Sequence, residues 1–178
     1  MSSRLDWLGA LSLEEAEAQL LTCCASRRWA RKLVANRPYL NETGLIEAAV
    51  SGVRELDWDD VQEALSAHPR IGERAEAVRG HADSSAEARR EARWSQDEQS
   101  GAAAADADVL AELAAGNLSY EQHFGHVFLI CATGRSAAEM LSELRIRINN
   151  SVEGERAVVR TELADIAALR IRKLLGHT

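Results

Sequence analysis

The sequence predicts an all-α protein, and three observations support this fold class. Residues that favour helices, chiefly Ala, Leu, Glu and Arg, are frequent, whereas only two prolines occur in 178 residues. Signals for the start of a helix recur along the chain, and no alternating strand pattern stands out. We therefore expect a single compact domain over residues 1–178, with a core over about 11–175 and about seven to nine helices.

The first part of the chain predicts four helices. Ser12 and Glu15 form a capping box, in which each side chain binds a backbone N–H of the other residue, and a helix follows from residue 13. Three further helices are expected at about 27–36, 42–53 and 58–67. Pro38 ends the first of these three, and Asp57 can cap the last.

The rest of the chain begins with an irregular stretch over 68–83, which is poor in apolar residues. A long helical pattern covers about 87–113, and Gly116 with its neighbour Asn117 predicts its end. Further helices are expected after capping boxes at Ser119 and Ser136, and over 155–175.

Composition and charge limit the possible function classes. The net charge of -7 argues against a nucleic-acid partner. Cys23, Cys24 and Cys131 show no CxxC spacing, so reduced thiols are expected. The longest apolar run, 127–132, is too short to span a membrane, and the N-terminus lacks the apolar core of a signal peptide. These features predict a cytoplasmic protein without a membrane partner.

The last predicted helix carries an arginine on its apolar side. Val159, Leu163 and Ile166 form a stripe, and Arg170 continues it by one more turn. The side chain either extends past the edge of the core into solvent or points inward to hold a carboxylate by two parallel hydrogen bonds. Periodicity alone leaves both interpretations open.

A second unusual segment lies around Trp94. Trp94 and Glu98 share one helical face, and Gly101 continues that face with almost no side-chain bulk, an arrangement expected at the border of a pocket. Ser95 and Gln99 form the neighbouring stripe. Ser95 and Glu98 also have the spacing of a capping box. Taken alone, the segment favours the cap.

His68 stands directly before Pro69, where the predicted 58–67 helix ends. The proline disfavours a helical conformation at His68 and directs its backbone into extended geometry. An imidazole suits proton transfer near neutral pH. A histidine here is also typical of a helix C-terminus with no catalytic role, and the local sequence favours that interpretation.

His123 and His126 are three residues apart, a spacing at which two helical histidines can share a metal ion. Neither an HExxH motif nor a third nearby ligand accompanies them, so we expect no catalytic metal. The apolar residues Phe124, Val127 and Phe128 predict a buried helix in this segment.

Four motifs together resemble a known family. In chain order they are His68-Pro69-x-x-Gly72, Ser95-x-x-Glu98-Gln99, the apolar segment from Phe124 to Ala132, and Leu169-Arg170-Ile171. Their order and separations are similar to those of the 2-oxo-4-hydroxy-4-carboxy-5-ureidoimidazoline (OHCU) decarboxylases of urate breakdown. The resemblance extends over about 11–175.

The resemblance implies an all-helical homodimer that converts OHCU, an anionic small molecule, to (S)-allantoin and carbon dioxide without a metal or organic cofactor. His68 is the implied catalytic histidine, and Glu98 is its acidic partner. The implied substrate-binding residues are Pro69, Ser95, Gln99, Phe128, Leu129, Ile130, Cys131, Ala132 and Arg170.

These residue types suit a decarboxylation. Loss of carbon dioxide leaves negative charge that the substrate's own ring carbonyl and nitrogen can delocalise, so no cofactor is required as an electron sink. The protein must orient the departing carboxylate and deliver a proton to one face of the ring. We expect His68 to act as the acid/base and Glu98 to set its orientation. Which proton His68 moves first stays open.

Two alternatives belong to other classes of protein. A helical metal-dependent hydrolase would use three histidines, namely His81, His123 and His126. A non-catalytic helical interaction module would lack a pocket that joins His68, Glu98 and Arg170.

Overall fold

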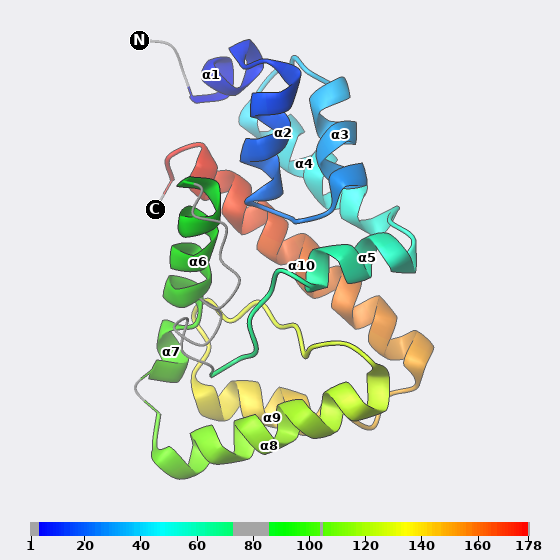
Figure 1. Ribbon diagram of the computed structural model, residues 1–178, viewed down its shortest axis with the longest axis vertical. Coiled ribbons are helices and arrows are strands. Elements are labelled where there is room, and N and C mark those ends of the chain that lie inside the picture. The colour runs from blue at the N-terminus through cyan, green and yellow to red at the C-terminus, as the bar shows by residue number, and fades with distance from the viewer. Residues whose placement is uncertain (1–3, 73–85, 104, 178) are drawn as a thin grey trace. The chain divides into compact units, whose positions relative to one another are not determined.

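The computed structural model describes residues 4–72, 86–103 and 105–177 (Figure 1). Across these ranges it contains ten α-helices and no β-strand, which confirms the all-α prediction. The helices outnumber the expectation because the helical patterns do not predict α1 (Arg4–Ala10), and because the long 87–113 pattern is divided among several helices. The chain groups into two compact units, residues 1–66 with 160–178 and residues 67–159. The single domain stays a prediction.

The first unit contains α1 to α5 and the C-terminal part of α10 (Val152–Leu174). Its other helices are α2 (Leu13–Leu21), α3 (Arg27–Ala35), α4 (Glu42–Arg54) and α5 (Trp58–Leu65). The predicted caps are confirmed. The hydroxyl of Ser12 accepts from the Glu15 N–H at 3.2 Å, and Glu15 accepts from the Ser12 N–H at 3.0 Å. Asp57 accepts from the Asp60 N–H at 3.0 Å.

The core of the first unit forms around Trp29 on α3. Helix α3 packs against both α2 and α4. The indole is buried, and its Nε1 donates to the carbonyl of Ala49 at 2.9 Å. Gly52 permits this approach, because a Cβ there would lie 3.0 Å from the indole ring. Cys23 and Cys24 are buried in this unit, and neither forms a disulfide with a described residue.

The second unit contains α6 to α9 and the start of α10. The helix bounds are α6 (Ala86–Glu98), α7 (Ser100–Ala103), α8 (Ala107–Phe124) and α9 (Ala137–Arg147). Helices α8 and α9 pack side by side (Figure 1). The predicted capping box at Ser136 is confirmed at the start of α9, where Ser136 and Glu139 bind each other's backbone N–H.

Two predicted helix boundaries inside α8 are wrong. The helix continues through Gly116, where a Cβ would lie 2.8 Å from a methyl of Leu144, so the glycine permits close packing of α8 against α9. It also continues through Ser119, whose hydroxyl donates to the carbonyl of Ala115 at 3.1 Å within the helix instead of capping a new one.

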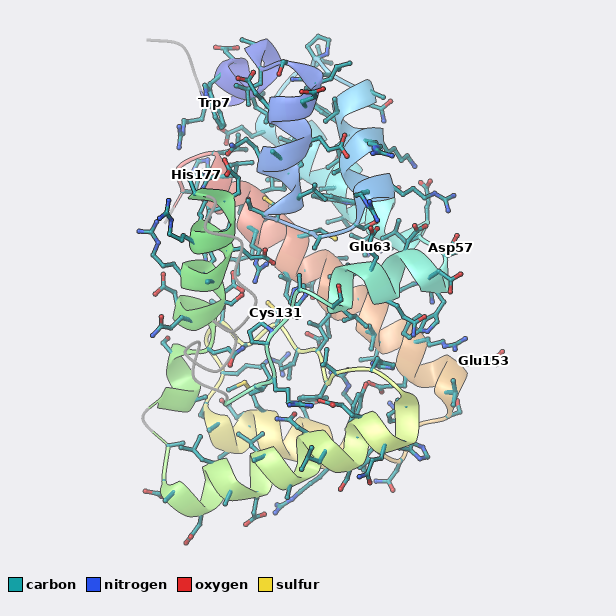
Figure 2. All side chains as sticks on the ribbon, viewed as in Figure 1. Trp7, Asp57, Glu63, Cys131, Glu153 and His177 are labelled. Atoms are coloured by element: carbon teal, nitrogen blue, oxygen red, sulfur yellow. The ribbon has the colours of Figure 1, made fainter. Side chains whose placement is uncertain are left out.

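The buried helix predicted beyond Phe124 is also wrong. Gly125 ends α8 in the left-handed conformation, with φ of 76°. Residues 126–132 then have no regular secondary structure, although most of their side chains are buried with apolar residues of α8 and α9. Cys131, labelled in Figure 2, lies on this segment. A continuous apolar run indicates burial but does not distinguish a helix from an extended segment.

None of the helices in the described ranges combines the length and apolar character that a membrane span requires.

Candidate active site

The 68–72 loop of the second unit carries His68. Residues 68–70 have no regular secondary structure, as Pro69 predicts, and His68 and Pro69 are half-buried. The irregular stretch predicted over 68–83 is therefore confirmed for 68–72, and the remainder lies outside the described residues.

The guanidinium of Arg70 attaches this loop to α8. It donates two hydrogen bonds to the Glu121 carboxylate, from Nε to Oε1 at 2.5 Å and from Nη2 to Oε2 at 2.9 Å. This two-point geometry fixes direction as well as distance. The hydrogen bonds from Arg70 also lower the pKa of the Glu121 carboxyl, so the pair is charged at neutral pH.

The backbone of the loop makes two further contacts with side chains. The carbonyl of Ile71 accepts a hydrogen bond of 2.9 Å from Nδ2 of the buried Asn117 on α8. The backbone N–H of Gly72 donates to Oε1 of Gln99 at 3.2 Å. The second contact brings two of the predicted motifs together, because Gln99 directly follows Glu98.

Ser95 and Glu98 are both buried, with 6% and 7% of their surface exposed. Ser95 lies inside α6 and not at its start, so the capping-box interpretation is wrong. The sequence spacing alone could not distinguish a helix cap from a buried position, and the structure shows that Ser95 is buried inside the helix. A carboxylate is costly to bury, and Glu98 is therefore a candidate functional group of the second unit.

The small residues after Glu98 have a packing role that the sequence interpretation missed. A Cβ at Gly101 would collide with the backbone carbonyl oxygen of Arg135. Gly101 therefore allows α7 to approach the turn before α9, and its lack of bulk does not by itself open a pocket. Ala102, beside it, is buried in the core of the unit.

The 126–132 segment is held by a buried ion pair. Arg147 donates from Nη2 to Oε1 of Glu155 at 2.6 Å, and from Nη1 to the carbonyl of Leu129 at 2.8 Å. Its guanidinium carbon also lies 4.6 Å from the ring centre of Phe128. The segment is thus bound through both its backbone and an aromatic side chain.

Tyr120 and Asn150 complete the surroundings of Glu155. The Tyr120 hydroxyl donates to Oε1 of Glu155, and Nδ2 of Asn150 donates to Oε2 at 2.8 Å. Burial alone would raise the pKa of Glu155, but the hydrogen bonds from Arg147, Tyr120 and Asn150 outweigh it and lower that pKa. Burial and the bond to Glu155 raise the pKa of Tyr120.

The network around Glu155 was not predicted from the sequence, although its arginine lies in a recognisable pattern. Met140, Leu144 and Arg147 lie at i, i+4 and i+7 on one helical face, so Arg147 continues an apolar stripe as Arg170 does. An arginine that continues an apolar stripe is thus informative at both positions.

Two of the three histidines proposed for a metal site, His123 and His126, lie within the described residues. His123 is exposed and stacks edge-on against Phe124. His126 is half-buried, with Nδ1 at 3.0 Å from the Val127 carbonyl, and burial lowers its pKa. Among the described residues no group of three His, Cys, Asp or Glu side chains is placed to hold a metal ion. His81 lies outside those residues.

Arg170 lies in the first unit, where only 1% of its surface is exposed. The inward orientation is therefore confirmed, and the interpretation that its side chain extends into solvent is wrong. Its place in the active site stays a prediction from the family resemblance.

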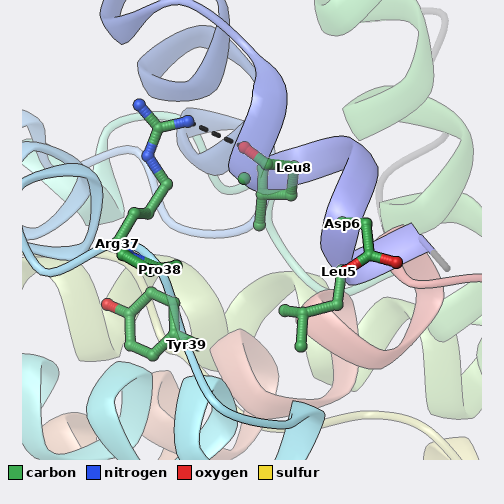
Figure 3. Close-up of a pocket in the computed structure, with 7 residues that line it drawn as sticks. Leu5, Asp6, Leu8, Arg37, Pro38 and Tyr39 are labelled. Carbon is green, nitrogen blue, oxygen red and sulfur yellow. Dashed lines mark hydrogen bonds between the residues drawn. The ribbon is translucent and has the colours of Figure 1, made fainter. Parts of the chain in front are cut away.

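A cavity of about 230 Å³ is also found in the first unit (Figure 3). Its lining residues are Leu5, Asp6, Leu8, Gly9, Arg37, Pro38 and Tyr39. Arg37 closes one side by donating to the carbonyl of Leu8 at 2.7 Å. None of the predicted site residues is among those that line it.

Sequence comparison relates the chain to proteins of urate breakdown. The family model for OHCU decarboxylase matches residues 9–172. The uric acid degradation bifunctional protein TTL of Arabidopsis thaliana is 33% identical over 167 residues, which cover 93% of this chain and 49% of that protein. The chain therefore spans about half the length of this relative.

Structure comparison agrees. A crystal structure of OHCU decarboxylase in the presence of (S)-allantoin matches with a TM-score of 0.73 and 31% identity, covering 89% of this chain and 98% of that chain. A crystal structure of (S)-allantoin synthase matches with a TM-score of 0.65 and 16% identity, covering 96% and 53%, and shows a similar fold alone. With a family model that matches nearly the whole sequence, the chain belongs to the OHCU decarboxylase family.

Proposed function

We propose that this chain decarboxylates OHCU to (S)-allantoin and carbon dioxide in the degradation of urate. The observation that carries the proposal is membership of the OHCU decarboxylase family, matched over residues 9–172. The likeness to an OHCU decarboxylase crystallised in the presence of (S)-allantoin supports the same reaction and product.

In this proposal His68 is the acid/base, and Glu98 orients its imidazole. Two observations support the pair. Both residues belong to the second unit, and the bond from Gly72 to Gln99 links the loop of His68 to the residue that follows Glu98. A buried carboxylate can hold an imidazole in one orientation and stabilise its protonated form.

The reaction needs a proton at one defined position. The bond between the carboxylate and the ring carbon that also bears the hydroxyl breaks, and carbon dioxide leaves. The electron pair moves into the bond to the neighbouring ureido-bearing carbon, whose ring nitrogen takes up the charge and a proton. His68 then donates a proton to the ureido-bearing carbon from one face, while the neighbouring hydroxyl gives up its proton and becomes a ring carbonyl of allantoin, so the product is a single enantiomer. Fixed donors around the ring would stabilise the negative charge as it develops.

Gln99 is suited to supply such a donor. A backbone N–H can only donate, so the bond from Gly72 identifies the bound atom of the side-chain amide as its oxygen. The NH2 group is thereby the end that can serve a substrate oxygen. We propose that Ser95 and Pro69 contact the ring and the ureido group beside it.

The 126–132 segment is proposed to line the pocket. The side chains of Phe128 and Ile130 belong to the core cluster, and the carbonyl of Leu129 binds Arg147. Contacts with substrate are therefore expected from other backbone groups of the segment and from Cys131, which is partly exposed, beside Ala132. Arg170 is proposed to hold an anionic or carbonyl group of the substrate.

The proposal is tested by supplying freshly generated OHCU and following (S)-allantoin by circular dichroism. The purified chain should accelerate formation of one enantiomer. Its activity should survive exhaustive chelation of metal ions, whereas a metal-dependent hydrolase would lose its activity. His68→Gln should reduce kcat by about 10²- to 10⁴-fold. His123→Gln, at an exposed histidine, is the matched control and should leave kcat unchanged. A His68→Gln protein as fast as the wild type would refute the assigned role.

We also propose that the protein is a cytoplasmic homodimer, as the family resemblance and the cysteine usage suggest. Light scattering on the purified protein should give twice the mass of one chain. A mass of one chain at assay concentration would contradict the dimer without affecting the proposed reaction.

A further inference from the structure

Two contacts of the 68–72 loop come from one face of α8. Asn117 and Glu121 are four residues apart, so their side chains project from the same face, one turn apart. We propose that Asn117 and Glu121 are positioning residues that hold this loop, and through it the imidazole of His68, at the reacting centre. The inference rests on the proposed function, in which His68 is the acid/base.

Asn117 is better explained by the loop than by packing. Only 1% of its surface is exposed, and its Nδ2 binds the Ile71 carbonyl. Its Oδ1 is buried and accepts no hydrogen bond from a described residue. A buried amide oxygen that accepts no hydrogen bond lowers the free energy of unfolding, and a leucine of similar size would not carry this penalty. The amide is thus retained for the bond that it donates to the loop.

Glu121 fixes the loop in a second direction. Its two oxygens bind Arg70 at two separate nitrogens, which restrains rotation of the guanidinium as well as its position. The carboxylate is half-buried and so contributes little to the core. A pair with this geometry and little effect on stability is suited to setting the conformation of the backbone.

The two contacts reach His68 through very little chain. Arg70 is two residues away, and Pro69 between them has a fixed φ angle. Restraining Arg70 and the carbonyl of Ile71 therefore leaves few rotations through which His68 could move. A displacement of about 1 Å in a reacting group can reduce the rate about 100-fold.

The experiment measures kcat and KM for Glu121→Ala, Glu121→Gln and Asn117→Asp in the full chain. Glu121→Ala should reduce kcat by about ten- to 100-fold, with KM within about threefold of the wild type. Glu121→Gln should lose less, because the amide oxygen still accepts one hydrogen bond from Arg70. Asn117→Asp removes the donor with little change of shape and should also reduce kcat. Gln122→Ala, exposed on the same helix, is the control and should leave both constants unchanged.

A double-mutant cycle separates positioning from a general structural effect. In a His68→Gln background, Glu121→Ala should cause no further loss of kcat, because the histidine that it positions is absent. An equal loss in both backgrounds would overturn the inference. If Asn117→Asp does not fold, as judged by far-ultraviolet circular dichroism, the Glu121 variants alone decide.

The inference and the proposed function fail in different ways. If His68→Gln is inactive and Glu121→Ala keeps kcat within about twofold of the wild type, positioning by α8 is wrong and the role of His68 stands. If His68→Gln is as active as the wild type, the assigned role of His68 is wrong, and the positioning inference fails with it.

Discussion

Two stretches of the second unit lack regular secondary structure and are both held by side chains, yet they are held in different ways. The 68–72 loop is held by the buried hydrogen bond from Asn117 and by an ion pair near the surface, in which the side chains of Arg70 and Glu121 are 39% and 21% exposed. The 126–132 segment depends on apolar burial and on the ion pair of Arg147 and Glu155, which are 4% and 0% exposed.

The difference separates control of conformation from stability. Breaking a surface ion pair costs little, because water replaces the lost partner. Breaking a buried pair leaves a charge without compensation inside the protein. The pair of Arg70 and Glu121 can therefore be broken while the fold survives, whereas the 126–132 segment cannot be released without disturbing the core on which it lies.

The largest expected effect comes from removing the carboxylate of the buried pair. Glu155→Ala should lower the free energy of unfolding by about 3–5 kcal/mol, because the guanidinium of Arg147 stays buried without its counter-charge. Urea unfolding followed by circular dichroism measures the loss. Glu153→Ala, on the exposed face of the same helix, should leave the midpoint unchanged. A loss below about 1 kcal/mol in Glu155→Ala would show that the segment does not depend on the pair.

The stability of the protein should also depend on pH through the ionised carboxylate of Glu155. The pKa of Glu155 is lower in the folded protein than in the unfolded chain, so the unfolded chain takes up the proton first as pH falls. The stabilisation from Glu155 is therefore present above its ordinary pKa of about 4.5 and is lost below it. In urea unfolding at a series of pH values, Glu155→Gln should lose less stability between about pH 5 and 3 than the wild type. Equal losses would contradict the prediction.

A smaller effect is expected at Tyr120. Tyr120→Phe removes the hydrogen bond to Glu155 and keeps the ring that packs against Phe128. The free energy of unfolding should fall by about 1.5–3 kcal/mol, the range for a hydrogen bond to a charged group. Thermal and urea unfolding should agree, and kcat measured on folded protein should be unchanged. A loss as large as that of Glu155→Ala would assign the main stabilising role to the hydroxyl.

The smallest effect on stability is expected at the loop. Glu121→Ala should lower the free energy of unfolding by less than about 1 kcal/mol, because the pair with Arg70 is partly exposed to water. The same urea experiment measures it. A loss near that of Glu155→Ala would remove the distinction between the two stretches, since the partly exposed pair would then stabilise the fold as much as the buried one.

Capping signals in the sequence correctly predicted where several helices start. Capping residues such as Ser12, Asp57 and Ser136 satisfy backbone groups within their own turn, and the structure confirms all three. Gly116 and Ser119 gave false boundaries, because contact with α9 and a bond within α8 decide those positions. The capping signals were therefore correct at these three helix starts, and the signals at Gly116 and Ser119 failed where another contact of the same residue was made instead.

Only part of the candidate site could be predicted from the spacing of residues in the sequence. The stripe of α10 singled out Arg170 but left two orientations open, and the burial of its side chain shows that it points inward. Spacing could not show that Ser95 lies inside a helix, nor that the apolar run after Gly125 would not be helical. Both depend on packing between segments distant in sequence. The network around Glu155 joins residues 35 positions apart, and no local pattern encodes such a contact.

The three cysteines differ in their exposure to solvent, and this difference allows one of them to be labelled selectively. Cys23 and Cys24 are buried, whereas Cys131 is partly exposed on the proposed pocket segment. Access of the reagent largely governs thiol labelling when no cysteine is specially activated. The first equivalent of a maleimide dye should therefore attach to Cys131 in the unmutated protein, and its emission would report on substrate arriving at that segment.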